Sequence, residues 1–433
     1  WTLPVPRAGR TAPLLALMAV AGVSALGLAA TMVAVPWFVL HSTGSGTWTG
    51  LVAAAETAGL LCSAVFAGPV VDRLPARAVS VGADLLTASA LALIPALHAV
   101  DVLAPPVLVV VVFVVGAARG PAETARQLLL PRALERAGVA LEAGTGSVEA
   151  ARRIGLMAGA PLAGLLIAAI GPVRTLCTDV GAALACCLLV AVLVPATPWA
   201  RTGSGGSPGS YLADLRSGWA HLNGDPLVRA VTTVLLVTNA LDGALNGVLY
   251  PAYGTQVLDS SALFGAMVTA IGVGALLGAA LYGRVGRRLS RRALFVGSFL
   301  LVGAVRCAAL AGEPPPWALL SLLAVSGLGS GALAPLMMSV AYERVPEEVR
   351  GRVFGMLTAC ALAAAPLGML GAGPALDGWG LTRTLLATGV LYLGVTLMPL
   401  VSRVWRELDE RTPRGAPVTD PSAPNAEVCR PSL

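Results

Sequence analysis

Charge is what this 433-residue sequence lacks most. Only 12% of its residues are charged, whereas 56% are hydrophobic and the mean hydropathy is +0.79. A soluble domain carries about 25% charged residues, so this chain cannot cover a water-exposed surface of ordinary size. Lysine is absent, and arginine supplies all 29 basic side chains. The composition excludes a soluble domain and indicates an all-α protein that crosses a membrane many times.

Side chains that hold metals or carry out catalysis are also scarce. The seven cysteines are scattered without a C-x-x-C pair, and the three histidines stand singly. This pattern excludes a disulfide framework and a metal site of ordinary spacing. No nucleotide-binding loop and no Ser/His/Asp set is visible. We therefore expect no metal, no cofactor and no enzymatic activity, and a membrane-embedded enzyme is the disfavoured alternative.

Long hydrophobic runs dominate what is there. A helix needs about 20 apolar residues to cross roughly 30 Å of hydrocarbon. Proline, glycine and short polar clusters separate segments of about this length. The sequence predicts twelve spans, at roughly 14–40, 48–70, 78–99, 103–125, 147–170, 173–196, 228–257, 261–282, 293–311, 317–342, 353–373 and 381–402.

The arginines predict the orientation of these spans. With twelve spans both termini lie on one side, and the loops of that side hold most of the arginines, whereas the opposite side has only Arg174 and Arg383. Cytoplasmic loops of membrane proteins are enriched in basic residues. We expect both termini in the cytoplasm and a multi-pass protein of a bacterial inner (plasma) membrane. The basic pI of about 9.2 thus reflects topology and not nucleic-acid binding.

The chain divides into two halves that resemble each other. Residues 1–196 form the first six-helix half and 228–402 the second, joined by a cytoplasmic linker at 197–227 that can include an amphipathic helix; a Pro-rich tail at 403–433 is expected to be disordered. Each half contains a helix of small residues, then an arginine-bearing loop and then a new apolar run. The two stretches are ETAGLLCSAVFAGPVVDRLPARAVSVGADLL and TAIGVGALLGAALYGRVGRRLSRRALFVGSFLL. Such duplication is typical of secondary transporters.

One loop carries a family resemblance. GPVVDRLPAR, at 68–77, resembles the signature G-x-x-x-D-R-x-G-R-R of the major facilitator superfamily. Pro75 and Ala76 depart from that signature, and in the second half Gly283 stands where the acid would be. The matching positions are Gly68, Asp72, Arg73 and Arg77.

Two further stretches, RGPAETARQLLLPRAL (119–134) and VPEEVRGRVFGM (345–356), resemble the drug- and macrolide-efflux branch of that superfamily. The resemblance covers about 12–402 and implies a twelve-helix fold in two pseudo-symmetric halves. It also implies a cytoplasmic gate in which Asp72, flanked by Arg73 and Arg77, docks near Gly351 at the start of a helix. A helix N-terminus stabilises a carboxylate. The alternative is that these charges only fix the topology.

A polar stripe marks the segment 228–257. TNALDGALNGVLYPAY carries five polar side chains that fall within roughly an 80° arc at helical spacing. Asp242 lies about 20 Å into the span, close to the midplane. In the resembled family this helix lines the central cavity, so the stripe is expected to face substrate; the alternative is a polar contact between helices. The stripe consists of Asn239, Asp242, Asn246, Tyr250 and Tyr253.

Ionisable residues inside a membrane are costly and mark functional sites. Asp242 is the first candidate for proton coupling and Glu56 is its rival. Arg119 and Glu123 are four residues apart, so they can pair on one helix face; Arg119 also stands near an arginine that the family links to proton coupling and is a cavity candidate. Asp179 and Arg306 fall within spans, and the sequence assigns them no role.

The sequence predicts a proton-driven exporter of a hydrophobic or amphipathic small molecule, such as an antibiotic or secondary metabolite, working as a monomer in the lipid bilayer by alternating access. GLMAGAPLAG (155–164) resembles a degenerate antiporter signature, and the mostly apolar segment 14–40 suits an amphipathic ligand. Export of a siderophore-like metabolite and metabolite/proton symport are alternatives. A membrane receptor or scaffold is the alternative outside transport.

Overall fold

The computed structural model describes residues 8–195, 226–286, 290–344, 347–401 and 405, and the secondary structure in these ranges is helical throughout. Ten of the described helices are long and apolar enough to cross a membrane. The all-α membrane fold expected from the composition is therefore confirmed. Most of the expected linker at 197–227 and of the tail at 403–433 lies outside the described residues.

The described part of the first half contains six helices, and each overlaps one predicted span. Two spans extend beyond their helices, since 103–125 begins before Pro105 and 173–196 ends after Leu193. Several helices continue past the apolar run, because a helix need not end where the hydrocarbon ends. The fourth, for example, ends at Gly138, whose left-handed φ of 67° stops the helix at a position that favours glycine. The helices are α1 (Ala8–Thr43), α2 (Gly46–Arg73), α3 (Ala76–Ala99), α4 (Pro105–Ala137), α5 (Leu141–Ile170) and α6 (Pro172–Leu193).

The second half repeats this plan, with two of its rods interrupted by one π-helical turn. Such turns insert an extra residue and are frequent at functional sites. Counting each interrupted rod once, the described residues form twelve rods in all, as predicted. The elements are α8 (Pro226–Ala244), η1 (Leu245–Leu249), α9 (Tyr250–Gln256), α10 (Ser261–Val285), α11 (Arg291–Leu300), η3 (Leu301–Val305), α12 (Arg306–Ala311), α13 (Pro316–Arg344), α14 (Glu347–Trp379) and α15 (Leu381–Val401).

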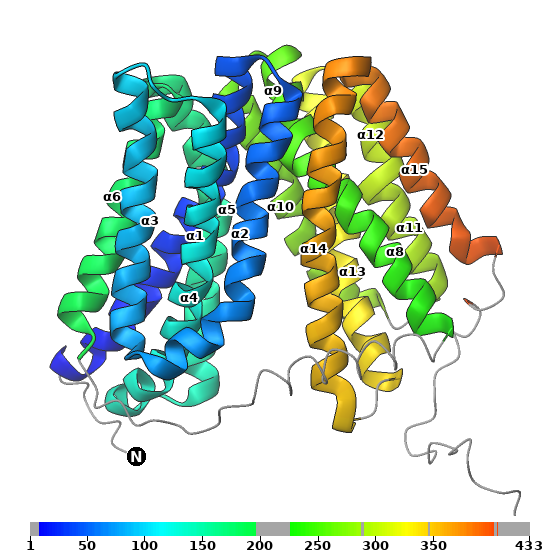
Figure 1. The fold of residues 1–433 in the computed structure, drawn as a ribbon. Helices are drawn as coiled ribbons and strands as arrows, with labels where there is room; N and C mark the ends of the chain where they lie inside the picture. Colours follow the sequence, from blue (N-terminus) through cyan, green and yellow to red (C-terminus); the bar gives the residue numbers. More distant parts are fainter. Residues whose placement is uncertain (1–7, 196–225, 287–289, 345–346, 402–404, 406–433) are drawn as a thin grey trace, which may run out of the picture.

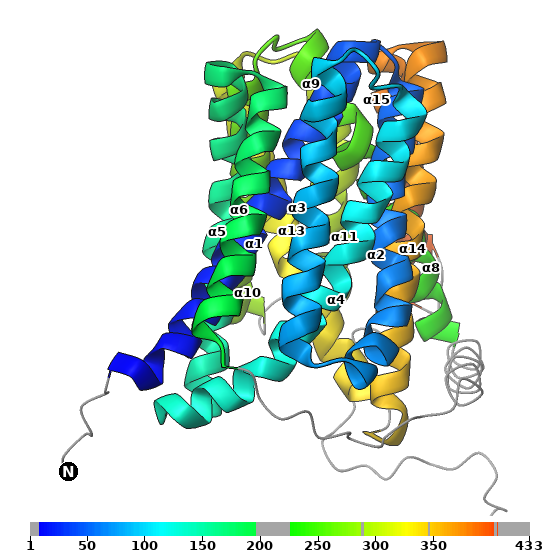
Figure 2. The same cartoon turned by 60° about the vertical axis from the view of Figure 1, so that its left-hand side comes forward.

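The two halves stand side by side as two bundles (Figure 1). They meet where α2 packs on α14 and α5 packs on α10, with a smaller contact of α1 on α9. Turning the molecule brings α6 and α5 forward and shows α1 slanting through the first bundle (Figure 2). We call the end at which α1 begins the proximal end, and the end with the α1–α2 turn the distal end.

The closest approach of the halves lies toward the distal end. There the backbone of α2 at Gly46 packs against Gly373 of α14, and a Cβ on Gly46 would lie only 2.9 Å from the Gly373 carbonyl oxygen. Across the second junction, the Ser261 hydroxyl of α10 donates to the Gly164 carbonyl of α5 at 3.0 Å. Small residues permit this backbone contact between helices. These contacts between the two halves hold the distal end of the bundle shut.

Candidate functional site

A largely buried ion pair connects α2 and α4. Arg119 Nη1 lies 2.7 Å from Glu56 Oε1, and the two side chains are 17% and 12% exposed. Gly116, one turn before Arg119, lets the helices touch, because a Cβ there would collide with the Glu56 carbonyl oxygen. A charge-assisted hydrogen bond of this length, shielded from water, is among the stronger polar contacts in a protein. The pair therefore fixes α2 and α4 relative to each other.

The same arginine continues the network toward α1 and α6. Arg119 Nη2 donates to the Thr31 hydroxyl at 2.9 Å, and that hydroxyl also makes a hydrogen bond with the Asp179 carboxyl of α6. Gly27, one turn before Thr31, leaves the space that Asp179 occupies: a Cβ on Gly27 would lie 2.5 Å from Asp179 Oδ1. One polar chain thus joins four helices of the first half, in the order Glu56, Arg119, Thr31, Asp179.

A second buried ion pair lies nearer the proximal end. Arg126 of α4 forms a salt bridge with Asp84 of α3 and donates to the Ser24 hydroxyl of α1 at 3.0 Å. Both charged side chains are less than a tenth exposed. Burying an ion pair costs desolvation energy, which only good geometry offsets. The pair is therefore a specific tie between three helices and not a solvated surface contact.

In the second half, Asp242 bonds to the last helix of the bundle. The Tyr392 hydroxyl of α15 donates to Asp242 Oδ1 at 2.9 Å. Asn239 and Asn246 turn their amides back to carbonyls of their own rod, four residues earlier, each at 2.8 Å. Asn246 is exposed and Asp242 is half-buried. This part of the predicted stripe, from Asn239 to Asn246, is therefore accessible from outside the packed core.

The two tyrosines of the stripe do not continue that open face. Tyr250 and Tyr253 are 1% and 0% exposed, so they lie in the packed core. The reason is η1, which separates Asp242 from Tyr250: its extra residue rotates everything after it by about 100° relative to regular helical spacing. Both tyrosines therefore lie away from the single polar face that constant helical spacing predicts.

Arg306 occupies the core of the second half. It follows directly after the π turn η3, donates from Nη1 to the Tyr250 hydroxyl at 2.7 Å and from Nε to Ser326 at 2.7 Å. Its Nη2 has no partner in the described part of the chain. Arg306 and Asp242 also attract each other electrostatically. The second half therefore contains a half-buried acid, Asp242, and a buried base, Arg306, in the same region.

The two halves use the same kind of contact between equivalent helices. In the first half a hydroxyl on the first helix, Thr31, meets an acid on the sixth, Asp179. In the second half an acid on the first helix, Asp242, meets a hydroxyl on the sixth, Tyr392. The acid and the hydroxyl are exchanged between the two helices, but in both halves the contact joins the first helix to the sixth, as a duplicated fold predicts.

Other expected pairings differ from the contacts in the structure. Arg119 forms its salt bridge with Glu56 and not with Glu123, which is exposed. By contrast, Glu149 on α5 does pair along its own helix, with Arg152 at 2.7 Å and Arg153 at 2.9 Å. Spacing along one helix predicts only neighbours of that helix, whereas a long arginine inside a bundle reaches the next helix.

Only some residues of the expected cytoplasmic gate lie in the described part of the chain. Arg73 is exposed, and Arg77 donates to the Ala191 carbonyl of α6. The side chain of Asp72 and the surroundings of Gly68 and Gly351 lie outside the described residues. The docking of Asp72 on the start of α14 therefore stays a prediction.

The distal end carries a polar contact between the halves that the sequence did not suggest. Asp377 lies near the end of α14, beyond the apolar run that ends at 373. It accepts hydrogen bonds from the backbone N–H groups of Gly46 at 2.6 Å and Thr47 at 2.9 Å. The hydroxyls of Ser45 and Thr47 donate to it as well. Partial burial works against the charged form, but these hydrogen bonds outweigh it, so the pKa of Asp377 lies below its ordinary value.

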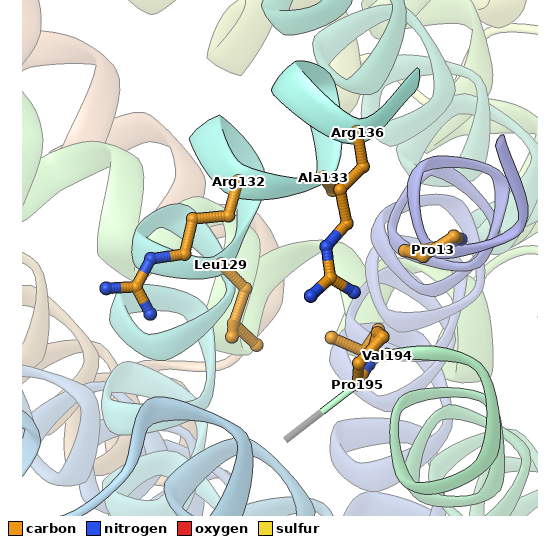
Figure 3. Close-up of a pocket in the computed structure, with 7 residues that line it drawn as sticks. All are labelled: Pro13, Leu129, Arg132, Ala133, Arg136, Val194 and Pro195. Atoms are coloured by element: carbon orange, nitrogen blue, oxygen red, sulfur yellow. The ribbon is translucent and has the colours of Figure 1, made fainter. Parts of the chain in front are cut away.

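No cluster of three or more metal-ligating side chains occurs among the described residues. A small hollow lies at the proximal end of the first half, where Arg132 and Arg136 of α4 stand beside Val194 and Pro195 (Figure 3). It shares no residue with the buried networks. The candidate site is therefore the pair of intramembrane networks, one in each half, and not this hollow.

Several residues of these networks were not singled out as site residues from the sequence. The sequence analysis passed over Asp84, Tyr392 and Asp377, while Thr31, Asp179 and Arg306 had no visible partner. Their partners lie far away in sequence, so only the packing of the helices identifies them. A usable signal was present for the acids, because a carboxylate inside an apolar run is rare without a function or a partner.

Comparison with known proteins decides the family. The profile of the Major Facilitator Superfamily matches residues 17–241 and 232–429, which is most of the chain. The chain belongs to the major facilitator superfamily. Membership in this superfamily confirms the expectation that the protein is a transporter and not an enzyme.

Curated relatives of this major facilitator match it over nearly its full length. The multidrug efflux pump Tap of Mycolicibacterium fortuitum is 34% identical over 407 residues, covering 92% of this chain and 97% of the relative. The multidrug efflux pump Tap of Mycobacterium tuberculosis is 32% identical over 420 residues, covering 94% of each.

Solved structures with the same fold share little sequence with it. A mutant form of the nucleoside transporter NupG superposes with a TM-score of 0.75 at 14% identity, covering 89% of this chain and 98% of that one. A bacterial homologue of the lysosomal transporter Spinster, in an inward-facing and unoccupied conformation, gives 0.69 at 14% identity, covering 95% and 100%. These likenesses confirm the twelve-helix architecture.

Proposed function

We propose that the protein is a proton-coupled exporter of amphipathic small molecules, in particular drugs, across the plasma membrane. The observation that supports this most directly is the ionisable network around Arg119 and Glu56, buried between helices of a chain whose full-length relatives are named multidrug efflux pumps. Ionisable groups inside a membrane protein mark ion pathways and proton relays. An exporter that is driven by the proton gradient needs such a group to bind and release the proton.

The arrangement of the halves supports transport by alternating access. The contacts between the halves that hold the distal end shut involve Gly46, Gly373 and Ser261. The arginine-rich loops support an orientation with the proximal end in the cytoplasm. In that orientation the structure represents a state closed to the outside. Both halves are supplied by one chain, so we propose that the transporter works as a monomer in the lipid bilayer.

The substrate would bind between the halves near the accessible part of the stripe. Asp242, Asn246 and Asn239 offer a carboxylate and two amides on one rod, and α1 and α14 offer mainly apolar walls. A pocket with a few polar groups among apolar side chains suits an amphipathic ligand, and a carboxylate favours a cationic one. Arg119 is a further cavity candidate because its side chain is not fully enclosed.

The sequence offers Asp242 and Glu56 as candidates for the coupled proton, with Arg119 and Glu123 as groups that respond to it. At the proximal end, Asp72 with Gly68, Arg73 and Arg77 would close the cytoplasmic side against Gly351. A carboxylate at a helix N-terminus gains roughly 0.3–1 kcal/mol, which is enough to bias a balanced equilibrium between two states.

The test uses cells preloaded with the fluorescent cation rhodamine 6G. Cells that express the protein are expected to lose the dye faster than cells with an empty vector, and an uncoupler that collapses the proton gradient should abolish the difference. Equal efflux with and without the protein would contradict export of this class of compound. Efflux that is faster but indifferent to the uncoupler would contradict proton coupling while leaving export intact.

A further inference from the structure

Asp179 is an acid whose surroundings do not balance its charge. It is 6% exposed and lies on α6 against α1. Among the described residues it makes no salt bridge, and its hydrogen-bond partner is the neutral Thr31. Two other buried acids each have a cation in direct contact: Arg119 binds Glu56, and Arg126 binds Asp84.

The charges in the network of the first half do not sum to zero. Glu56, Arg119 and Asp179 belong to one hydrogen-bonded chain through Thr31. With every group in its ordinary charge state the chain carries two negative charges and one positive charge. An uncompensated charge in a dry interior is costly, so such a group takes up a proton instead. One bound proton makes this network neutral.

The hydrogen bonds around Thr31 indicate where that proton sits. Its hydroxyl oxygen receives an N–H from Arg119 at 2.9 Å and lies in hydrogen-bond contact with two acceptors, the Gly27 carbonyl at 2.9 Å and the Asp179 carboxyl. A hydroxyl has one hydrogen and two lone pairs. It cannot donate fully to both acceptors, so an ionised Asp179 leaves one of these contacts without a hydrogen.

Protonation of Asp179 removes that conflict. The carboxylic acid then donates its O–H to Thr31, and Thr31 donates its own hydrogen to the Gly27 carbonyl. Thr31 still accepts from Arg119, so both of its lone pairs and its hydrogen are used. Gly27 provides the space for this contact, since a side chain at that position would displace the Asp179 carboxyl.

We propose that Asp179 is the residue that binds and releases the coupled proton, with Thr31 linking it to the Arg119–Glu56 pair. This assignment rests on the proposed function of proton-coupled export. On release, the O–H bond of Asp179 breaks and the proton passes to water through the partly exposed side of the network at Glu56 and Arg119. Thr31 then turns its hydrogen from Gly27 to the new carboxylate, which Arg119 stabilises across the hydroxyl.

The groups that surround Asp179 on each neighbouring helix define its proton affinity. From α1 it faces Thr31 and Gly27, while Arg119 of α4 attracts the carboxylate and Glu56 of α2 repels it. Cys186, two turns along α6, is the thiol in electrostatic contact with it. On α3, which packs on α6, Asp84 is already bound to Arg126. The decisive neighbours are therefore Arg119 and Glu56, and a movement of Arg119 between the two acids would change the proton affinity.

The experiment uses the purified full-length protein in liposomes with rhodamine 6G as the probe. Two activities are measured: accumulation driven by a pH gradient, and counterflow exchange without a gradient. Asp179→Asn is expected to reduce gradient-driven accumulation at least tenfold while counterflow stays within about twofold, because exchange needs no net proton movement. The control Cys177→Ala, an exposed position on the same helix, should leave both activities unchanged.

A second variant keeps Asp179 and removes only the hydroxyl that links it to Arg119. Thr31→Val has nearly the same shape but can neither accept from the acid nor donate to the carboxylate. Substrate-induced proton release, followed with a pH-indicator dye, should move to higher pH by about one unit. Both forms of Asp179 lose a hydrogen bond, but the bond to the charged carboxylate is the stronger of the two, so its loss dominates. This readout covers the case in which Asp179→Asn does not fold.

The outcomes separate the two claims. Gradient-driven accumulation by Asp179→Asn at the wild-type rate, or an unchanged pH profile in Thr31→Val, would overturn the assignment of Asp179 while proton-coupled export stands. Wild-type protein that exchanges the probe but never accumulates it under a pH gradient would overturn proton coupling itself, and the assignment with it.

Discussion

The carboxylate of Asp377 on α14 accepts the backbone N–H of Gly46, the first residue of α2, at 2.6 Å. The contact joins the second half of the transporter to the first. The first N–H groups of a helix have no partner within the helix, and a carboxylate there satisfies them and favours the positive end of the helix dipole. Since α2 and α14 belong to different halves, this cap can exist only while the distal end is shut.

Loss of the cap should favour opening of the distal end. Asp377→Ala removes the acceptor of four hydrogen bonds and is expected to weaken the closed state by about 0.5–2 kcal/mol, toward the lower value because the site is exposed. Spin labels at His41 and Trp379, measured by pulsed EPR, should show a larger fraction of long distances. Asp259→Asn, an exposed acid at the same end, is the matched control. An unchanged distance distribution in Asp377→Ala would show that the cap does not hold the halves together.

The cap also predicts a pH dependence with a definite sign. The pKa of Asp377 is lowered in this closed state, so its contribution is fully present above the ordinary carboxyl pKa of about 3.9 and is lost as the pH falls through the lowered value. The fraction of closed distal ends should therefore be constant from about pH 8 to 5 as far as Asp377 is concerned. Below about pH 4 it should fall in wild type but not in Asp377→Ala, which has no cap to lose. A parallel fall in both proteins would assign the effect to other groups.

The Arg119–Glu56 pair should behave as a unit in stability measurements. Arg119→Gln leaves buried acids without their cation and should destabilise the protein by about 3–5 kcal/mol. Glu56→Gln should cost less, because an ionised Asp179 can then balance the charge of Arg119. The double variant should be much less destabilised than the sum of the two. Thermal unfolding of the detergent-purified variants gives the coupling as a double-mutant cycle. Strict additivity would show that the two charges do not interact.

Tyr392 and Gly303 form a tight contact that tests the packing around Asp242. A Cβ on Gly303 would fall within the Tyr392 ring, so Gly303→Ala must displace the ring and is expected to cost about 1–3 kcal/mol. Gly297→Ala on the neighbouring part of the same rod meets nothing within 4 Å and should be neutral or slightly stabilising. Equal melting temperatures for the two variants would contradict the position of Tyr392, and with it the hydrogen bond to Asp242.

The sequence predicted the rods of the fold well because hydrocarbon thickness fixes their length and the apolar runs show it directly. The candidate site was less predictable. The prediction that Asp242 faces a substrate cavity stays a prediction, whereas Tyr250 lies in the core after η1, and a π turn leaves no mark on hydropathy. The local pairing expected for Arg119 failed for a related reason: its side chain selects among neighbouring helices, and those are set by packing. Asp179 could not be interpreted without Thr31, which lies 148 residues away in the chain.

The measurement that tests the account most directly is proton movement in inverted membrane vesicles that contain the protein. Respiration makes the lumen acidic, and an exporter in this orientation would carry rhodamine 6G into the lumen and protons out. The account predicts that adding rhodamine 6G partly collapses the pH gradient in vesicles with the transporter but not in vesicles without it. A gradient that stays unchanged while rhodamine 6G still accumulates would contradict proton-coupled export.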